Sequence, residues 1–280
     1  MFWQTTRFLI DLARPKVMGI VNVTPDSFSD GGRLGATAIR HCERLVAEGA
    51  DMLDIGGEST RPGSLPVSVE AELARVLPVL DAALTLGCPV SVDTNKPEVM
   101  RAVLERGADI INDISALQRP GALDEVAAHP RCGICLMHMR GDPLTMQQRP
   151  AYDDVLAEVG RFLADRLAAA RAQGIAADRI VLDPGIGFGK SVEHNLMLLR
   201  RQPELMALGQ PLLVGWSRKS TLGTLTGRSE VSERVAASVA AALAAVQLGA
   251  RVVRVHDVAP TVDALKVWAA AGLAAGPAHG

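Results

Sequence analysis

The sequence has little of what marks several common classes of protein. Four cysteines in 280 residues are too few for a disulfide framework. No run of about 18 apolar residues occurs, so no membrane span and no membrane partner are expected. The net charge is −2, without any block of like charges, which argues against a nucleic-acid partner bound by a broad basic surface. A local anion site remains compatible with this charge.

The first sixteen residues form an N-terminal extension that lacks the signature of secretion. Arg7, Asp11 and Arg14 surround a short apolar segment, residues 8–10, where a signal peptide would have a long apolar core. We therefore expect a cytoplasmic protein.

Cys132 and Cys135 have the spacing of a redox or metal pair, but no second pair follows them. Both lie in the apolar run 132–137. We expect buried strand cysteines, which behave as small hydrophobic side chains. Redox or metal chemistry is the alternative.

The chain instead alternates short apolar runs with longer helical patterns. Several of these patterns end at a glycine, which adopts the left-handed cap without strain, as at Gly49, Gly107 and Gly174. Strands are expected at 17–22, 52–55, 90–92, 110–111, 133–137, 180–182, 212–214 and 252–255, and helices at 38–48, 69–84, 97–106, 123–128, 152–173, 192–202, 231–248 and 261–271.

Eight strand-then-helix units with short links predict a parallel sheet, and eight strands are enough to close a barrel. Polar clusters follow all eight strands, whereas an open doubly wound sheet, the alternative, gathers function near one switch point. We therefore predict the α/β class and a (β/α)8 TIM barrel, with its active site where the strands end. Residues 1–280 form one domain, with the extension at 1–16 and a disordered tail at 274–280.

The last strand ends in a candidate anion site. Arg254 and His256 are two residues apart, so they share one face, and an arginine fork with an imidazole suits a phosphate or diphosphate. Asn22, at the end of the first strand, becomes their neighbour when the barrel closes, and its amide oxygen could ligate Mg2+ beside substrate phosphates. The alternative for Arg254 is a structural salt bridge, with Asp257 as a possible partner.

Asp93, Asn112 and Asp183 each follow a buried strand. Two carboxylates and an amide facing one cavity suit a ligand edge with several N–H groups, such as a pterin or a purine. A carboxylate metal cage or a purely structural role is the alternative.

Two further clusters follow later strands. Ser217 and Lys219 share a face if the chain stays extended, and Lys219 would bring positive charge into the pocket. Residues 185–191 look like a phosphate loop but have Pro184 where that motif needs glycine. Their glycines would instead allow a sharp turn, and Phe188 could line the pocket.

At the fifth strand, Met137 is expected to give an apolar contact to the ligand. His138 is as consistent with a structural role as with a functional one.

Residues 23–35 and 56–68 are long loops after the first two strands. Loops of that length are usually functional or disordered, and we expect mobile lids, with solvated linkers as the alternative. The helix at 231–248 is almost wholly Val, Ala and Leu from 235 to 246. A helix apolar on every side is covered on more than one face, so a homodimer contact is expected there, the alternative being burial between its barrel neighbours.

Together these motifs resemble the dihydropteroate synthase family of folate biosynthesis. Residues 22–32 (NVTPDSFSDGG) and 54–63 (DIGGESTRPG) are similar to its two signatures, and 183–190, 217–219 and 254–257 match the rest. The resemblance covers residues 16–268.

The resemblance implies condensation of 6-hydroxymethyl-7,8-dihydropterin diphosphate with p-aminobenzoate, with Mg2+ at the diphosphate and a p-aminobenzoate pocket for which sulfonamides compete. The family's mechanism is SN1-like: diphosphate leaves, Asp93 stabilises the pterin cation, and the aryl amine attacks. By resemblance the pterin contacts Asp93, Asn112, Ile114, Met137, Asp183, Lys219 and Arg254; diphosphate contacts Asn22, Thr60, Arg254 and His256; Mg2+ contacts Asn22; and p-aminobenzoate contacts Thr60, Arg61, Pro62, Phe188, Ser217 and Lys219.

Two other functions remain open. A methyltetrahydrofolate methyltransferase-like barrel would keep the pterin anchors but need no diphosphate site. A non-catalytic paralogue would bind pterin without turnover.

Overall fold

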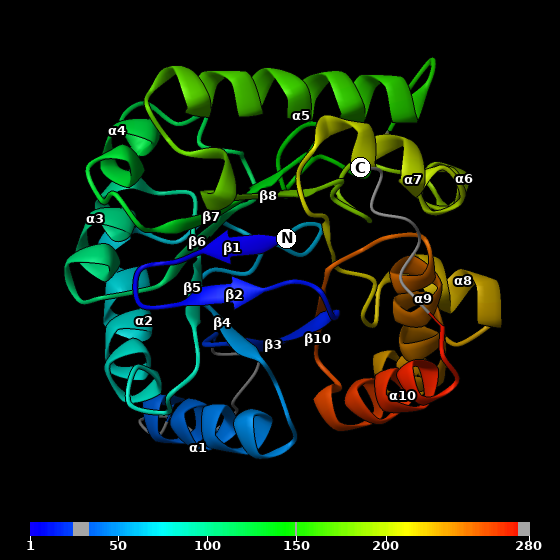
Figure 1. Cartoon of the computed structure of the whole chain (residues 1–280), viewed down its shortest axis with the longest axis horizontal. Coiled ribbons are helices and arrows are strands. Elements are labelled where there is room, and N and C mark those ends of the chain that lie inside the picture. The colour runs from blue at the N-terminus through cyan, green and yellow to red at the C-terminus, as the bar shows by residue number, and fades with distance from the viewer. Residues whose placement is uncertain (25–33, 149, 274–280) are drawn as a thin grey trace.

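The computed structural model describes residues 1–24, 34–148 and 150–273 (Figure 1). The expected tail and most of the first lid therefore lie outside the described residues. Eight parallel strands lie in the order β8-β7-β6-β5-β4-β3-β10-β9, and a parallel bridge between Leu182 and Leu212 joins the two ends of this order. The predicted (β/α)8 barrel is thus confirmed. Its strands are β3 (Lys16–Asn22), β4 (Met52–Gly56), β5 (Val90–Asp93), β6 (Ile110–Asp113), β7 (Gly133–Met137), β8 (Ile180–Asp183), β9 (Leu213–Val214) and β10 (Val252–Val255).

The helices lie outside the ring of strands (Figure 1). Each expected helix is present within a few residues of its predicted bounds. Ser68 and Asp154 cap two of them by accepting bonds from backbone N–H groups, and Ser191 with His194 forms a capping box at a third. The helices are α1 (Leu34–Ala47), α2 (Val69–Ala83), α3 (Pro97–Glu105), α4 (Ala122–Ala127), α5 (Val155–Ala172), α6 (Val192–Arg200), α9 (Val235–Gln247) and α10 (Val258–Ala270), with the unexpected short helices α7 (Gln202–Leu205) and α8 (Ser220–Thr226).

The strands separate two apolar cores. The larger one fills the space between the sheet and the helices. The smaller one lies inside the barrel near the amino ends of the strands and includes Met18, Met52, Ile110 and Cys135. These side chains point inward because they alternate with outward-facing residues along each strand.

Cys132 and Cys135 are fully buried, and burial raises the pKa of the Cys132 thiol to about 12. Among the described residues no group of three His, Cys, Asp or Glu could hold a metal ion. The burial of the two cysteines agrees with the expectation of buried strand cysteines.

The N-terminal extension, for which no secondary structure was predicted, forms an antiparallel hairpin. Its strands β1 (Phe2–Gln4) and β2 (Leu9–Asp11) cross the amino end of the barrel, which faces the viewer in Figure 1. Trp3, Ile10 and Leu12 enter the inner core, and the Trp3 indole donates a hydrogen bond to the Arg179 carbonyl at 3.0 Å. The hairpin therefore closes the end of the barrel opposite to the predicted active site.

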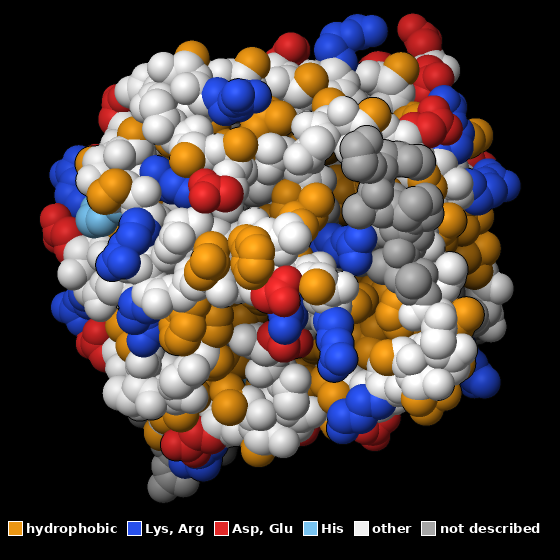
Figure 2. Space-filling model, in the orientation of Figure 1, with side chains coloured by type: hydrophobic (Ala, Val, Ile, Leu, Met, Phe, Trp, Pro, Cys, Tyr) orange, Lys and Arg blue, Asp and Glu red, His pale blue; other side chains and the backbone are white. Residues whose placement is uncertain are grey.

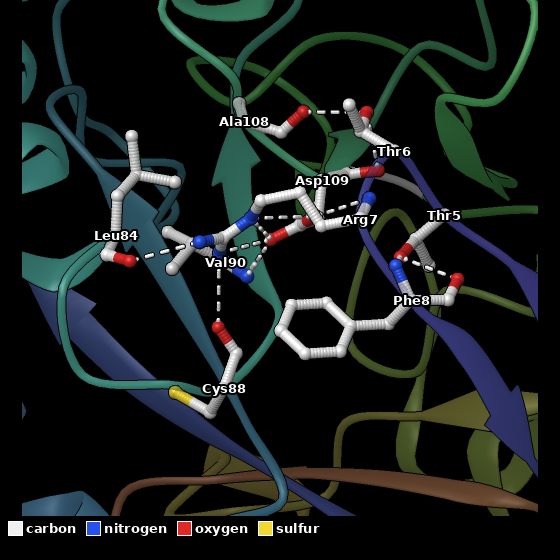
Figure 3. Close-up of polar contacts among 9 residues, drawn as sticks. All are labelled: Thr5, Thr6, Arg7, Phe8, Leu84, Cys88, Val90, Ala108 and Asp109. Carbon is white, nitrogen blue, oxygen red and sulfur yellow. Dashed lines mark hydrogen bonds and ion pairs between the residues drawn. The ribbon is translucent and has the colours of Figure 1, made fainter.

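Arg7, in the turn of this hairpin, fastens it to the barrel (Figure 3). Its guanidinium donates to Asp109 Oδ2 at 2.6 Å and to the carbonyls of Leu84 and Cys88 at 2.8 and 3.1 Å. Asp109 also accepts the backbone N–H groups of Arg7 and Val90, at 3.0 and 2.8 Å. Both carboxylate oxygens of this fully buried aspartate are therefore satisfied.

Acidic and basic side chains are interspersed over the described part of this face in Figure 2, with no broad area of one sign. Within residues 1–24, 34–148 and 150–273, no helix is long and apolar enough to cross a membrane.

Candidate active site

A pocket of about 320 Å³ opens at the carboxyl ends of the strands. Strands β3, β5 and β10 and the loops after β4, β8 and β9 contribute to it, so residues far apart in the sequence meet there. Most of the predicted site residues line it: Asn22, Thr60, Arg61, Pro62, Asp93, Phe188, Ser217, Lys219, Arg254 and His256.

The other predicted residues do not line this pocket. Asp183 ends β8, Met137 ends β7, Asn112 is the penultimate residue of β6, and Ile114 follows β6. All four are buried. They lie at the same carboxyl end of the barrel as the pocket residues, since each lies at or next to the carboxyl end of a strand of the ring.

Arg254 links the strand ends by salt bridges. Its Nε donates to Asp54 Oδ2 at 2.5 Å, and its Nη2 donates to Asp93 Oδ2 at 2.8 Å. Asn112 Nδ2 also donates to Asp54 Oδ2, at 3.1 Å. The suggested partner Asp257 was wrong: that carboxylate pairs with Arg218 at 2.6 Å.

Asp54 is a site residue that the sequence reasoning missed. It is fully buried in β4, and its Oδ1 has no hydrogen-bond partner among the described residues. An acid inside the apolar run 52–55 was the available signal, because a buried charge is rare unless it is paired.

Arg254 compensates the negative charge of the buried Asp93 only in part. Burial raises its pKa to about 7, against the lowering effect of Arg254, while the nearby Asp54 and Glu72 carboxylates raise it further. Two carboxylates, Asp54 and Asp93, thus share one arginine. Such a group stabilises positive charge that develops on a ligand beside it.

Lys219, in the loop after β9, brings positive charge to the site, opposite in sign to the carboxylates of Asp54 and Asp93. Burial lowers its pKa to about 8, against the raising effect of Asp183. Its ammonium donates to the Ile186 carbonyl and lies 4.6 Å from the centre of the Phe188 ring. Gly187 has a φ of +81°, and a Cβ there would lie 2.9 Å from Lys219 Cδ. Glycine at 187 therefore leaves the space that this lysine occupies.

The glycine-rich segment after β8 is a turn organised by Lys190 and is not a phosphate loop. Lys190 Nζ is buried and contacts the carbonyls of Gly185 and Phe188 at 2.9 and 3.0 Å and His138 Nδ1 at 2.9 Å. Burial, with the charges of Lys190 and Arg140, lowers the pKa of His138 to about 3. His138 is thus a satisfied internal residue in this structure.

Ser217 and Lys219 both reach the pocket, but for a different reason from the one predicted. Arg218 has a φ of +59°, so the chain turns there and is not extended. The backbone N–H of His256 donates to Ser217 Oγ at 3.0 Å, and His256 Nδ1 lies at the same distance from it. Burial and the neighbouring Arg254 lower the pKa of His256 to about 3, so its imidazole is neutral near pH 7.

Thr60, Arg61 and Pro62 lie at the rim of the pocket, in the loop after β4. Ser64 Oγ donates to the Ser59 carbonyl at 2.6 Å, and Gly63 N donates to the Pro143 carbonyl at 2.9 Å. This loop is therefore bonded both internally and to the segment after β7.

Comparison with known proteins agrees with this geometry. The family model described as pterin binding enzyme matches residues 18–256. The chain is 56% identical over 278 residues to dihydropteroate synthase of Neisseria meningitidis serogroup B, covering 97% of this chain and 98% of that protein.

Two solved structures are similar throughout. Xanthomonas albilineans dihydropteroate synthase with 4-aminobenzoic acid is 55% identical, with a TM-score of 0.90 and coverage of 94% of this chain and 95% of that one. Yersinia pestis dihydropteroate synthase in complex with a sulfonamide drug is 46% identical, with a TM-score of 0.92 and coverage of 97% and 99%. The chain belongs to the dihydropteroate synthase family of pterin-binding enzymes.

Proposed function

We propose that this chain condenses 6-hydroxymethyl-7,8-dihydropterin diphosphate with p-aminobenzoate to give 7,8-dihydropteroate and diphosphate, as a step of folate biosynthesis. The observation that carries this proposal is a single pocket lined both by the anion-binding candidates Arg254 and His256 and by the loop residues Thr60–Pro62. A methyltransferase-like barrel would have no use for this combination.

The pterin is assigned to the inner end of the site. Asp93, Asn112 and Asp183 offer acceptors and an amide to the ring N–H groups, and Lys219 can donate to a ring carbonyl or nitrogen. Arg254 holds Asp93 and, through Asp54, Asn112, so the anchors are fixed relative to each other. Ile114 and Met137 would give the ring apolar contact.

Diphosphate is assigned to Asn22, Thr60, Arg254 and His256. Arg254 supplies a full positive charge, and the neutral His256 ring can donate a hydrogen bond.

Asn22 is the proposed contact for Mg2+. Its amide oxygen belongs to the hard ligands that Mg2+ prefers, but one side chain cannot form a complete site. Among the described residues no cluster of three His, Cys, Asp or Glu provides one either. The residues therefore fit an ion that arrives with the substrate diphosphate and keeps several waters. Bound there, Mg2+ would offset the charge of the leaving group.

p-Aminobenzoate is assigned to Thr60, Arg61, Pro62, Phe188, Ser217 and Lys219. Arg61 can pair with its carboxylate at the rim, and the Phe188 ring can pack against the benzene ring. A sulfonamide, which presents a similar aryl amine, would compete for the same place.

The reaction needs positioning and charge stabilisation more than a strong base. The bond between the pterin methylene and the diphosphate oxygen breaks, and its electron pair leaves with the diphosphate. Asp93, in its ionised form, stabilises the cation that remains. The aryl amine attacks this carbon and then loses a proton to water or diphosphate. An aryl amine is nucleophilic while neutral, so the reaction does not require a side-chain base to activate it.

The experiment is turnover of purified protein with both substrates, following dihydropteroate and released diphosphate. We expect both products, with dependence on Mg2+ and inhibition by a sulfonamide. Pterin binding without either product would refute the synthase and favour the non-catalytic or methyltransferase-like function.

We also propose a homodimer formed around α9. Ala236 and Ala240 on this helix are exposed, and Leu225 and Val231 beside it have 52% and 47% of their surface exposed. Such small and apolar side chains allow close helix contact. Sedimentation of wild type and Ala240→Arg tests this: a dimer that the substitution dissociates is expected, and a monomeric wild type would contradict it.

The proposed compartment is the cytoplasm, which the four free, buried cysteines support. Cell fractionation that recovers the activity from membranes or an extracellular fraction would contradict it.

A further inference from the structure

The loop after β4 is closed at its base by one carboxylate. Glu58 Oε2 accepts a hydrogen bond from the backbone N–H of Val67 at 2.8 Å. Residues 59–66, which include Thr60, Arg61 and Pro62, lie between these two positions. Glu58 itself lines the pocket. A single side chain thus joins the start and the end of the segment to which p-aminobenzoate binding is assigned.

Lys96 fastens this carboxylate to the barrel wall. Its Nζ donates to Glu58 Oε2 at 2.6 Å and also to the Glu72 carboxylate on α2. Lys96 precedes α3 and is 6% exposed, and Glu72 is 0% exposed. One lysine therefore connects the loop with two helices in a buried position, where ion pairs are little screened by salt.

The loop also packs directly on α2. Arg75 Nη1 donates to the Gly57 carbonyl at 2.7 Å. A Cβ at Gly57 would lie 2.8 Å from Val76 Cγ2 and 3.1 Å from Glu72 Cγ. The chain before Glu58 therefore has no room to shift toward α2 without moving core side chains.

We propose that Glu58 and Lys96 are positioning residues that hold segment 59–66 over the pocket in the geometry that binds p-aminobenzoate. This inference rests on the proposed function for the identity of the ligand. A loop ordered in advance loses less conformational entropy when the ligand binds, so the benefit falls on binding of the second substrate. The pterin anchors lie on other strands and are not touched by this tie.

The first variant is Glu58→Ala, which severs the links to both Val67 and Lys96. It leaves Lys96 paired with Glu72, so the remaining buried charges balance and folding is retained. Lys96→Met is a poorer choice because it leaves two facing carboxylates without their cation. Glu58→Gln is the conservative partner, since it keeps an acceptor for the Val67 N–H group.

Steady-state kinetics give the first readout. For Glu58→Ala we expect the KM for p-aminobenzoate to rise about tenfold, with kcat at saturation within about twofold of wild type. The Kd for dihydropterin diphosphate should rise much less, because Thr60 is its only assigned contact within segment 59–66. Glu58→Gln is expected to recover part of the KM. The control is Asp81→Asn, which breaks the Asp81–Arg106 pair between α2 and α3 far from the loop and should change none of these values.

Amide hydrogen exchange gives a readout that does not need turnover. Exchange in peptides covering 59–67 is expected to accelerate in Glu58→Ala and to stay unchanged in Asp81→Asn. Unchanged exchange, an unchanged KM, or an equal loss of pterin affinity would each overturn the inference. A wild-type protein that formed no dihydropteroate would instead refute the proposed function, and the exchange result would still decide whether Glu58 orders the loop.

Discussion

The two ends of the barrel each have an arginine paired with buried aspartate, but the two clusters are satisfied to different degrees. At the amino end, Arg7 and two backbone N–H groups bond both oxygens of Asp109. At the carboxyl end, Arg254 is shared by Asp54 and Asp93, and Asp54 Oδ1 has no partner among the described residues. The first cluster is complete in itself, whereas the second has unused capacity for a ligand.

This difference separates stability from function. A buried polar group costs free energy unless its hydrogen bonds are made, so a saturated pair serves the fold. Burial raises the pKa of Asp93 to about 7, so its ionised form is incompletely compensated and lowers stability. Such a carboxylate is typical of a site where it stabilises positive charge that develops on a ligand. Substitutions in the two clusters should therefore separate these two roles.

The largest effect is expected for Asp93→Asn. The amide keeps an acceptor for Arg254 but removes the negative charge opposite the pterin cation. We expect kcat to fall about 1,000-fold, with diphosphate binding much less affected. The free energy of unfolding at pH 8 should not fall, because a buried charge is removed. Turnover assays and urea denaturation measure the two quantities. Wild-type kcat, or a loss of stability that accounts for the loss of activity, would contradict the assignment.

The converse variant is Arg7→Met at the other end. It leaves the Asp109 carboxylate buried without its cation, which should cost about 3 kcal/mol in the free energy of unfolding. Because the hairpin is far from the pocket, kcat and both KM values should remain those of the wild type at temperatures where the variant is folded.

Urea denaturation of Arg7→Met is compared with that of Arg106→Met. This second substitution removes an exposed partner of Asp81 and should cost less than about 1 kcal/mol. Equal losses in the two variants would show that the Arg7 cluster has no special role.

The same contrast explains what could be predicted from the sequence. The barrel was predictable because its strands are mostly apolar runs and its helices carry end signals, as at Gly107 before β6. Several pocket residues were predictable because they end or follow such a run, whereas Thr60, Arg61 and Pro62 were assigned from the family resemblance. Both signals are local, and the closed ring brings local features together in a fixed order.

The pairings within the site were not predictable, because they depend on contacts between distant strands. Arg254 pairs with Asp54 rather than with Asp257, three residues further along the chain, since the closed ring puts β4 within its reach and Asp257 already pairs with Arg218. The N-terminal hairpin was missed because its strands are only three residues long, too short for a periodic pattern.

The smallest effect is expected in the pH dependence of kcat/KM. Asp93 must be ionised and Lys219 protonated, and their pKa values are about 7 and about 8. For the free enzyme, kcat/KM for the dihydropterin diphosphate should fall about tenfold per pH unit below 7 and again above 8. Lys219→Arg should remove the alkaline limb, while Arg7→Met should leave both limbs in place.

Below pH 7, the contribution of Asp93 to stability should change with pH in the opposite direction to activity. The folded-state pKa of Asp93 lies above its ordinary value of 3.8, so the native protein binds the proton more tightly than the unfolded chain does. The contribution of Asp93 to the free energy of unfolding therefore decreases as the pH rises from about 4 to about 7, while activity increases. Subtracting the stability curve of Asp93→Asn from that of wild type isolates this contribution. If the difference between the two curves is flat or rises over this range, burial does not destabilise the ionised form of Asp93. The proposed contrast between the two ends of the barrel would then be wrong.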